Sequence, residues 1–234
     1  MATTDRSTED TGRPLRRDAE RNRERIITAA RAVFATRGLA ATLDDVAHHA
    51  GVGIGTVYRR FPTKEALVSA ALDERLDELA AAVEAALQAP TGWDGFTGLL
   101  RQVAEMHAAD RGLRDLALGG GYGVGHHERI GTRMVPLITR LIERAREEGT
   151  LREDVTAEDV PLILMMISEV ALHSHRVRPD AYARYLQLLI DGLRRSPDHG
   201  DLGRPLIQDD VDAVARHWLP SIESRRTPSP GTTG

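Results

Sequence analysis

The segment from Thr42 to Leu67 constrains the fold more than any other part of the chain, because it has the spacing of two short helices joined by a turn. Thr42 can cap the first helix with its hydroxyl, and Asp45 completes a box-like capping pair three residues later. Gly51 ends this helix, since a tight turn between helices often needs a residue that tolerates positive φ. A very short second helix follows and offers small or hydrogen-bonding groups outward. The segment therefore predicts a helix-turn-helix that reads DNA.

The same segment resembles the DNA-binding part of the tetracycline-repressor (TetR) family. The positions that carry the resemblance are Thr42, Ala47, Ala50, Gly51, Val52, Gly55, Thr56, Tyr58, Phe61, Lys64 and Leu67. The resemblance implies that Thr42, Tyr58 and Lys64 hold DNA phosphates. It also implies that five residues of the second helix and its start face the bases: Gly53, Ile54, Gly55, Thr56 and Arg59.

Physical chemistry agrees with two of these assignments, because helix N-termini present free amides and a positive dipole end at Thr42 and at Lys64. We expect Phe61 to pack in the core rather than on DNA. Gly53 and Ile54 depart from the polar residues often seen at these family positions, which favours contact with thymine methyl groups over hydrogen-bond readout.

The whole chain predicts an all-α protein, because no convincing period-two strand is present. We expect an N-terminal three-helix DNA-binding domain followed by a helical ligand-binding and dimerisation domain. The first helix is expected from about Asp18 to Arg37, and Pro136 is expected to kink or restart a helix within Glu128–Glu147. The expected division is a flexible basic arm at 1–17, a DNA-binding domain at 18–67, an effector-binding and dimerisation domain at 68–195, and a tail with a short amphipathic helix at 196–234.

Charge is uneven along the chain. Residues 1–65 hold 12 Arg and Lys against 9 Asp and Glu, whereas the remainder holds 19 against 26. A basic end on an acidic body is expected where only one part meets phosphate, although three net charges are weak support alone. The arginines before the first helix either enter a neighbouring DNA groove or are simply solvated.

Two late helices, at about 156–174 and 180–195, resemble the pair through which TetR-family proteins dimerise. The residues from Val160 to Ile167 are apolar nearly all around, which is more than one intramolecular face requires. The alternative is burial within one subunit. A homodimer would place its two DNA-binding domains about 34 Å apart, or a multiple of that distance, and would recognise a palindromic operator.

The family binds a small-molecule effector between about residues 91 and 175, and no motif there identifies the ligand. Six residues could line an adaptable pocket, although a plain hydrophobic core explains each of them separately: Trp93, Phe96, Met106, Tyr122, Met134 and Met165. The stretch Gly119–Gly125 follows no strand and precedes no lysine, so we interpret it as a flexible loop and not a phosphate-binding loop.

Other functional classes fit the sequence less well. A metal-dependent hydrolase could use histidines of the body domain, but adjacent or i,i+2 histidines do not share a helix face. The candidate residues are His107, His126, His127, His173 and His175. A DNA-compacting protein would need a more basic body. We therefore expect no catalytic residue, no metal and no cofactor. Without cysteines or a long apolar segment, the chain is expected to be soluble and cytoplasmic. The family resemblance implies a repressor that a ligand releases from its operator.

Overall fold

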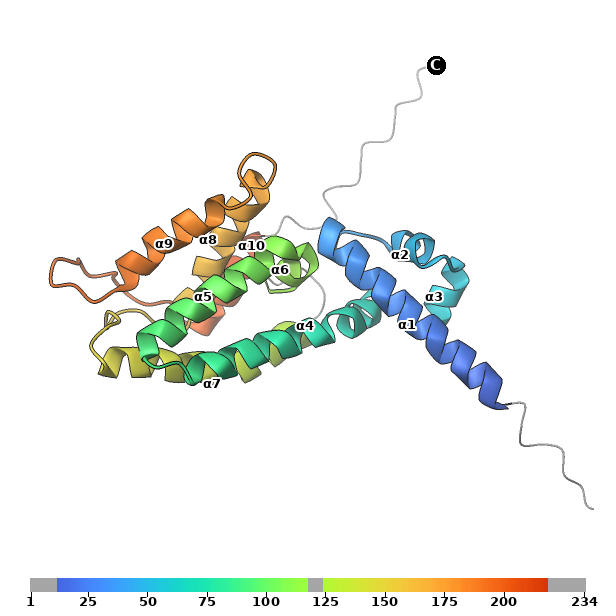
Figure 1. Cartoon of the computed structure of the whole chain (residues 1–234), viewed down its shortest axis with the longest axis horizontal. Coiled ribbons are helices and arrows are strands. Elements are labelled where there is room, and N and C mark those ends of the chain that lie inside the picture. Colours follow the sequence, from blue (N-terminus) through green and yellow to red (C-terminus); the bar gives the residue numbers. More distant parts are fainter. Residues whose placement is uncertain (1–11, 118–123, 219–234) are drawn as a thin grey trace, which may run out of the picture.

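The computed structural model describes residues 12–117 and 124–218, without the side chains of 12–18, 74, 116–131 and 215–218. The described residues form ten helices and no β-strand, so the prediction of an all-α fold is confirmed (Figure 1). The helices are α1 (Gly12–Arg37), α2 (Leu43–Ala50), α3 (Ile54–Arg60), α4 (Lys64–Leu87), α5 (Gly92–Ala109), α6 (Arg111–Ala117), α7 (Val124–Glu147), α8 (Asp159–Ser174), α9 (Ala181–Leu193) and α10 (Gln208–Trp218).

The N-terminal domain is formed by α1, α2, α3 and the first turns of α4, which enclose one hydrophobic cluster. Its largest fully buried side chains include Phe34, Leu39 and Leu67. Helix α1 begins at Gly12, six residues before the start expected at Asp18, so that residues 12–17 of the expected arm are helical. Pro14 permits this start, because the first helical turn has backbone amides without intrahelical acceptors. Residues 1–11 lie outside the described part of the chain.

Helix α4 connects the N-terminal domain with the body, which comprises the later part of α4 and the helices α5 to α10 (Figure 1). Thr63 caps its start by accepting a hydrogen bond from the amide of Ala66 at 3.2 Å. At its other end, Arg144 of α7 donates to the carbonyl groups of Leu87 and Ala89 at 3.1 and 3.0 Å. These bonds satisfy carbonyls that the helix itself leaves without donors.

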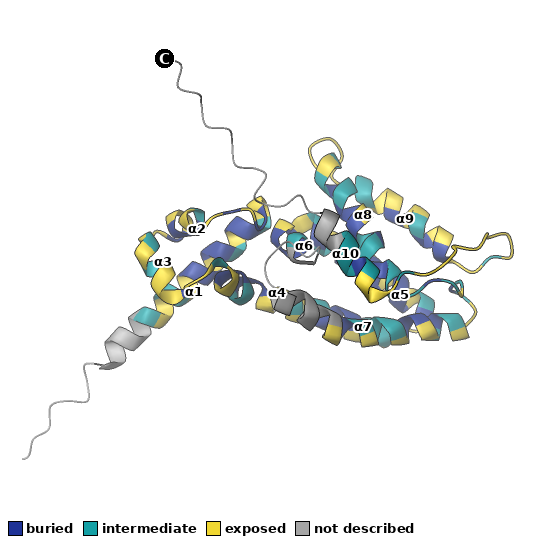
Figure 2. Cartoon of the chain, turned by 180° about the vertical axis from the view of Figure 1, so that it is seen from behind, coloured by how far each residue is buried: buried dark blue, intermediate teal, exposed yellow. Residues whose placement is uncertain are grey.

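Helix α5 lies at the centre of the body, with α4 and α7 on one side and α8 and α9 on the other. The buried residues face inward from all of these helices (Figure 2). Helix α7 begins at Val124, ahead of the expected Glu128, and continues as one helix through Pro136. Residues 118–123, which hold most of the expected glycine loop, are outside the described residues.

Thr156 and Asp159 have the spacing of a capping box at the start of α8, but only half of that box forms. The carboxylate of Asp159 accepts the amide of Thr156 at 2.7 Å, as a capping box requires. The reciprocal bond is missing, because the Thr156 hydroxyl lies 3.4 Å from the same carboxylate and the Asp159 amide bonds to the Thr156 carbonyl. The helix therefore begins at Asp159 and ends at Ser174, close to the predicted end.

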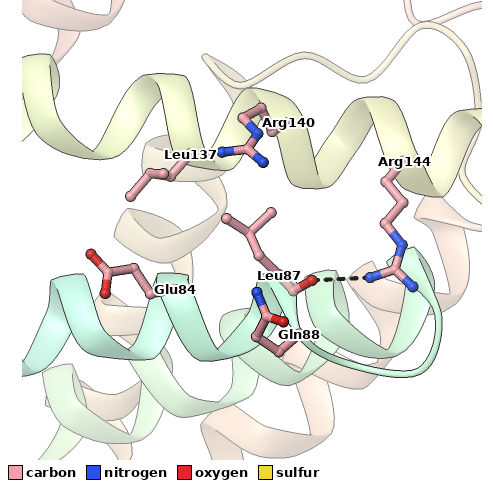
Figure 3. A pocket seen from close by; sticks show the side chains of 6 residues that line it. All are labelled: Glu84, Leu87, Gln88, Leu137, Arg140 and Arg144. Carbon is pink, nitrogen blue, oxygen red and sulfur yellow. Dashed lines mark hydrogen bonds between the residues drawn. The ribbon is translucent and has the colours of Figure 1, made fainter.

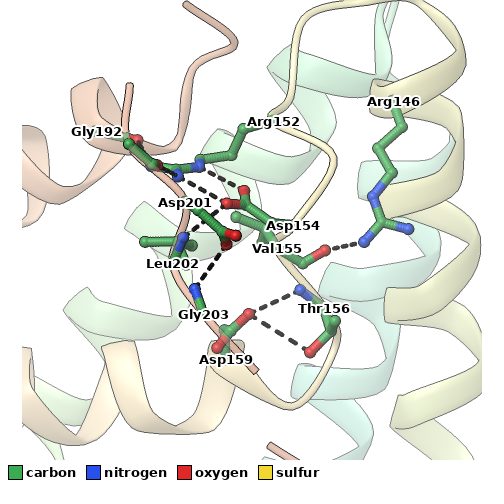
Figure 4. A network of polar contacts seen from close by, with 11 residues as sticks. Arg146, Arg152, Asp154, Val155, Thr156, Asp159, Gly192, Asp201, Leu202 and Gly203 are labelled. Carbon is green, nitrogen blue, oxygen red and sulfur yellow. Dashed lines mark hydrogen bonds and ion pairs between the residues drawn. The ribbon is translucent and has the colours of Figure 1, made fainter. Parts of the chain in front are cut away.

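A segment that we call the strap, residues 194–207, joins α9 to α10 and is held by an ion pair (Figure 4). Arg152 and Asp154 form two bonds of 2.6 and 2.8 Å. Arg152 also donates to the Gly200 carbonyl at 2.6 Å, and Asp154 accepts the Leu202 amide at 3.0 Å. The bonds from Arg152 hold the pKa of the Asp154 carboxyl well below its usual range. After the strap, α10 forms the amphipathic helix that was predicted for the tail.

None of the helices in the described residues is both long and apolar enough to cross a membrane.

Candidate DNA interface and ligand site

Helix α2 and the turn after it form as the sequence predicts. The Thr42 hydroxyl accepts the Asp45 amide at 3.1 Å, and the Asp45 carboxylate accepts the Thr42 amide at 2.9 Å, which completes a capping box. Gly51 ends the helix with φ +64°, in the left-handed region that glycine adopts without a Cβ clash. The bond from Thr42 and the nearby Arg37 lower the pKa of Asp45.

Helix α3 exposes one face and anchors the other. Val57 is fully buried, and Tyr58 is 53% exposed, so the aromatic ring of Tyr58 is available to a partner. Thr56 and Arg59 meet on the outer side, where the guanidinium donates to the threonine hydroxyl at 3.2 Å. Phe61 is buried, as expected.

The start of α3 is open to close approach. A Cβ atom placed on Gly53 or Gly55 would meet nothing within 4 Å, so another molecule can come close to the backbone at both positions. Ile54, by contrast, is partly buried against the core of the N-terminal domain. Less of its side chain is therefore available for bases than the sequence indicates.

Lys64 is only partly available to a phosphate. Its ammonium donates to the Leu39 carbonyl at 2.6 Å, within the N-terminal domain. Burial lowers the pKa of Lys64. As the first residue of α4, Lys64 still presents its backbone amide at the positive end of a long helix.

Sequence reasoning missed Arg60, the last residue of α3. It is exposed and lies next to Tyr58 and Arg59 in the chain. A wheel projection would not have indicated this exposure, because Arg60 follows the buried Val57 by three residues and such positions lie on the same side of a helix.

The six residues predicted for a ligand pocket are mostly part of the body core. Phe96, Met134 and Met165 are buried, and Met106 is partly buried. Trp93 is partly buried against the core, and the guanidinium of Arg194 lies 5.0 Å from its ring centroid. Tyr122 falls outside the described residues.

A groove of 470 Å³ lies elsewhere on the body, between α4 and α7, and none of the six residues lines it (Figure 3). Leu87 and Leu137 give it an apolar part, and Glu84, Gln88, Arg140 and Arg144 give it a polar rim. Arg144 is fixed by the carbonyl groups at the end of α4. Arg140 is exposed and makes no hydrogen bond or ion pair in the described part of the chain.

The body core also contains polar groups that packing alone does not require. His107 of α5 lies 3.1 Å from the hydroxyl of Ser168 on α8, and both residues are buried. That hydroxyl donates to the Leu164 carbonyl at 2.7 Å, so its only proton is used and the imidazole must donate through Nδ1. Burial, together with the charge of Arg114, lowers the pKa of His107 to about 4.

In the described parts of the chain, no three His, Asp or Glu side chains lie close enough together to hold a metal ion. His173 pairs with Glu169 at 3.2 Å on the surface, whereas His107 is buried in the body.

Comparison with known proteins gives the following similarities. Residues 26–71 match the family described as bacterial regulatory proteins, tetR family, and residues 93–195 match the SbtR-like transcriptional regulator C-terminal domain. The solved structure of the TetR transcription regulatory protein from Mycobacterium vanbaalenii is 32% identical, with a TM-score of 0.50. That match covers 78% of this chain and 100% of the other.

The HTH-type transcriptional repressor SCO4008 of Streptomyces coelicolor is 24% identical over 205 residues, which cover 86% of this chain and 96% of that protein. A match to the HTH-type transcriptional regulator SAR0097 of Staphylococcus aureus is 34% identical over 83 residues and spans 44% of that relative's length. The crystal structure of RolR in complex with resorcinol shares the fold, with a TM-score of 0.51 and 21% identity over 91% of this chain and 98% of the other.

Proposed function

The chain belongs to the TetR family of bacterial transcriptional regulators, and from this premise we propose that it is a homodimeric, ligand-responsive repressor of the cytoplasm that binds a palindromic operator. The observation that carries the proposal is the outer face of α3, where Gly55, Tyr58 and Arg59 are exposed, with Gly53 exposed at the N-cap of the same helix. Such a face combines close backbone approach with a hydrogen-bonding aromatic residue and a guanidinium, as major-groove readout requires.

In the proposed complex, phosphates and bases are contacted by different residues. Tyr58 and the backbone amides at the starts of α2 and α4, near Thr42 and Lys64, hold phosphates. Thr56 and Arg59 face base edges, and the open backbone at Gly55 lets α3 come close to them. The Thr42 hydroxyl is engaged with Asp45, so its contribution to phosphate binding comes through the main chain.

Dimerisation through α8 and α9 is supported by apolar side chains that the single subunit leaves exposed. Tyr185 and Leu188 lie one turn apart on α9, opposite the buried Leu186 and Ile190. Met166 of α8 is also exposed. A second copy of the chain would cover these side chains by forming a four-helix bundle around a twofold axis.

Two further parts of the proposal are that a small-molecule effector binds in the body domain and that the protein represses transcription. A relative that aligns with 86% of this chain over 96% of its own length is a repressor, and RolR, which shares the fold, binds resorcinol. We place the effector in the body domain, where the buried His107 and Ser168 offer polar groups for orientation. Release requires that the effector binds the DNA-incompetent state more tightly, with coupling of about 1–3 kcal/mol.

Selection of DNA duplexes from a random library by the full-length protein tests the proposal. We expect an enriched palindrome whose half-sites are about 10 base pairs apart, or a multiple of this spacing. Arg59→Ala is expected to change the preferred bases, whereas Tyr58→Phe weakens binding to all sequences alike. Arg140→Ala, an exposed arginine on α7 far from α3, is the matched control. A selection that enriches no sequence would contradict operator recognition.

A further inference from the structure

The backbone amide and the backbone carbonyl of Leu39 are each held by a side chain, and the two side chains come from different helices. Its amide donates to Oδ2 of Asp115 at 2.9 Å, and its carbonyl accepts the Lys64 ammonium at 2.6 Å. Leu39 itself is 1% exposed and fills the core of the N-terminal domain. It stands in the turn between α1 and α2, three residues before Thr42 caps the first helix of the reading motif.

The two side chains come from the two parts of the molecule. Asp115 lies on α6 in the body, and Lys64 begins α4, directly after the reading motif. Asp115 is itself fixed, because its Oδ1 accepts a bond of 3.0 Å from the buried Arg114. The hydrogen bonds to the main chain of Leu39 therefore join the body and the N-terminal domain through one residue.

The approach of α6 to this turn is too close for most residues. A Cβ atom on Gly38 would lie 2.2 Å from Oδ2 of Asp115, and the φ of Gly38 is +71°. One turn earlier on α6, a Cβ atom on Gly112 would lie 2.9 Å from Cβ of Phe34 on α1. Because these surfaces are in close contact, α6 cannot shift toward α1 without displacing the turn that precedes α2.

The direction of the Lys64 side chain bears on its role. An ammonium that holds a carbonyl inside the domain has fewer donors left for DNA, and its half-buried position makes it less available to phosphate. The lowered pKa of Lys64 agrees with this position, since desolvation is its main cause.

We propose that Lys64 and Asp115 are positioning residues for DNA binding, which clamp the main chain at Leu39 and so let the body domain set the position of the reading helices. This inference rests on the proposed function for its consequence, because the clamp matters to regulation only if the chain reads an operator. The clamp itself is a property of the free protein, and it can be measured without DNA.

The first experiment is hydrogen exchange of the Leu39 amide in the full-length protein. In Asp115→Ala the buried amide loses its acceptor, so its exchange should accelerate about tenfold to a hundredfold. Asp115→Asn keeps an acceptor oxygen and should restore most of the protection. Asp198→Ala, which removes an exposed carboxylate with no side-chain hydrogen bond in the described residues, is the control. Exchange in Asp115→Ala as slow as in the wild type, or no rescue by Asp115→Asn, would overturn the clamp.

The second experiment measures the affinity for the selected duplex at several salt concentrations. Removing a negative charge strengthens DNA binding if only long-range electrostatics acts, but loss of the clamp in Asp115→Ala should weaken binding about tenfold or more. Lys64→Met should weaken binding with an unchanged salt slope. If the ammonium contacts phosphate instead, the slope should fall by about 1.8 for the two subunits of a dimer.

The outcomes separate the two proposals. A wild-type protein that selects no operator would refute the proposed function, while the exchange of Leu39 would still decide whether the clamp exists. An operator-binding wild type whose affinity is unchanged or increased by Asp115→Ala would refute the positioning role alone. A reduced salt slope in Lys64→Met would assign Lys64 to the phosphates.

Discussion

The buried imidazole of His107 makes a specific prediction about stability and pH. The ring is 3% exposed, lies 3.1 Å from the Ser168 hydroxyl, and has its pKa lowered from 6.5 to about 4 by burial and by the charge of Arg114. The folded protein therefore resists protonation of His107, whereas the unfolded chain accepts a proton near pH 6.5. The stability that follows from this difference is present above pH 6.5 and is lost as the pH falls from 6.5 toward 4.

The size of this loss follows from the shift in pKa. At 1.36 kcal/mol for each pKa unit, the shift corresponds to a free energy of unfolding that falls by about 3 kcal/mol when the pH drops from 7 to 4. About 2 kcal/mol of this loss should occur by pH 5. A loss of that size is a large fraction of the stability of a typical domain.

Urea unfolding of the wild type and of His107→Asn, followed by circular dichroism at pH 7, 6 and 5, measures the effect. Asparagine retains an N–H group that can donate to Ser168, but it does not titrate. Contributions from carboxylates common to both proteins cancel in the difference, provided that protein concentration and ionic strength are the same. The gap in free energy between the two proteins should shrink by about 2 kcal/mol from pH 7 to pH 5. Parallel free-energy profiles over this range would refute the reasoning, because they would mean that the folded and unfolded pKa values of His107 are alike.

Three further substitutions have expected outcomes. Arg144→Ala should lower the free energy of unfolding by about 2–3 kcal/mol, because it removes charged donors from the end of α4, whereas Arg140→Ala should change it by less than about 0.5 kcal/mol. Gly112→Ala should cost about 1–3 kcal/mol in urea unfolding, since its Cβ atom would press on Phe34. Leu188→Glu should shift the protein from dimer to monomer in analytical ultracentrifugation. Leu202 on the strap is 55% exposed, against 57% for Leu188, and Leu202→Glu should leave the dimer intact. The opposite pattern would rule out an interface on α9.

The reading motif could be predicted from the sequence because its determinants are local. Thr42 and Asp45 lie three residues apart and cap one helix, and the left-handed φ of Gly51 is needed within the same turn. The alternation of buried and exposed residues on α3 also follows from helical spacing, with Val57 inward and Tyr58 outward. Each of these features depends on neighbours in the chain.

Neither the contact between the domains nor the buried polar pair within the body could be predicted, because the partners in each are far apart in sequence. Leu39 and Asp115 are separated by 76 residues, and His107 and Ser168 by 61. The motif supplied the identity of Lys64 but not the inward direction of its ammonium, which depends on where the Leu39 carbonyl lies in the folded domain.

The residues predicted to line a ligand pocket show a different limit of prediction from sequence. Large apolar side chains such as Phe96 and Met165 are equally suited to a core and to an adaptable pocket, so composition cannot distinguish the two. In the folded body they fill the core. The groove between α4 and α7 arises from helix packing, and its lining residues had no signal in the sequence.

A titration of the full-length protein against a labelled duplex tests the central claim most directly. Fluorescence anisotropy would be measured with the selected palindrome and with a scrambled duplex of the same composition, at one near-physiological salt concentration. Native mass spectrometry would give the stoichiometry. We expect the palindrome to bind more tightly by about a thousandfold or more, with two subunits for each site. Equal and weak binding to both duplexes would contradict the account of an operator-reading dimer.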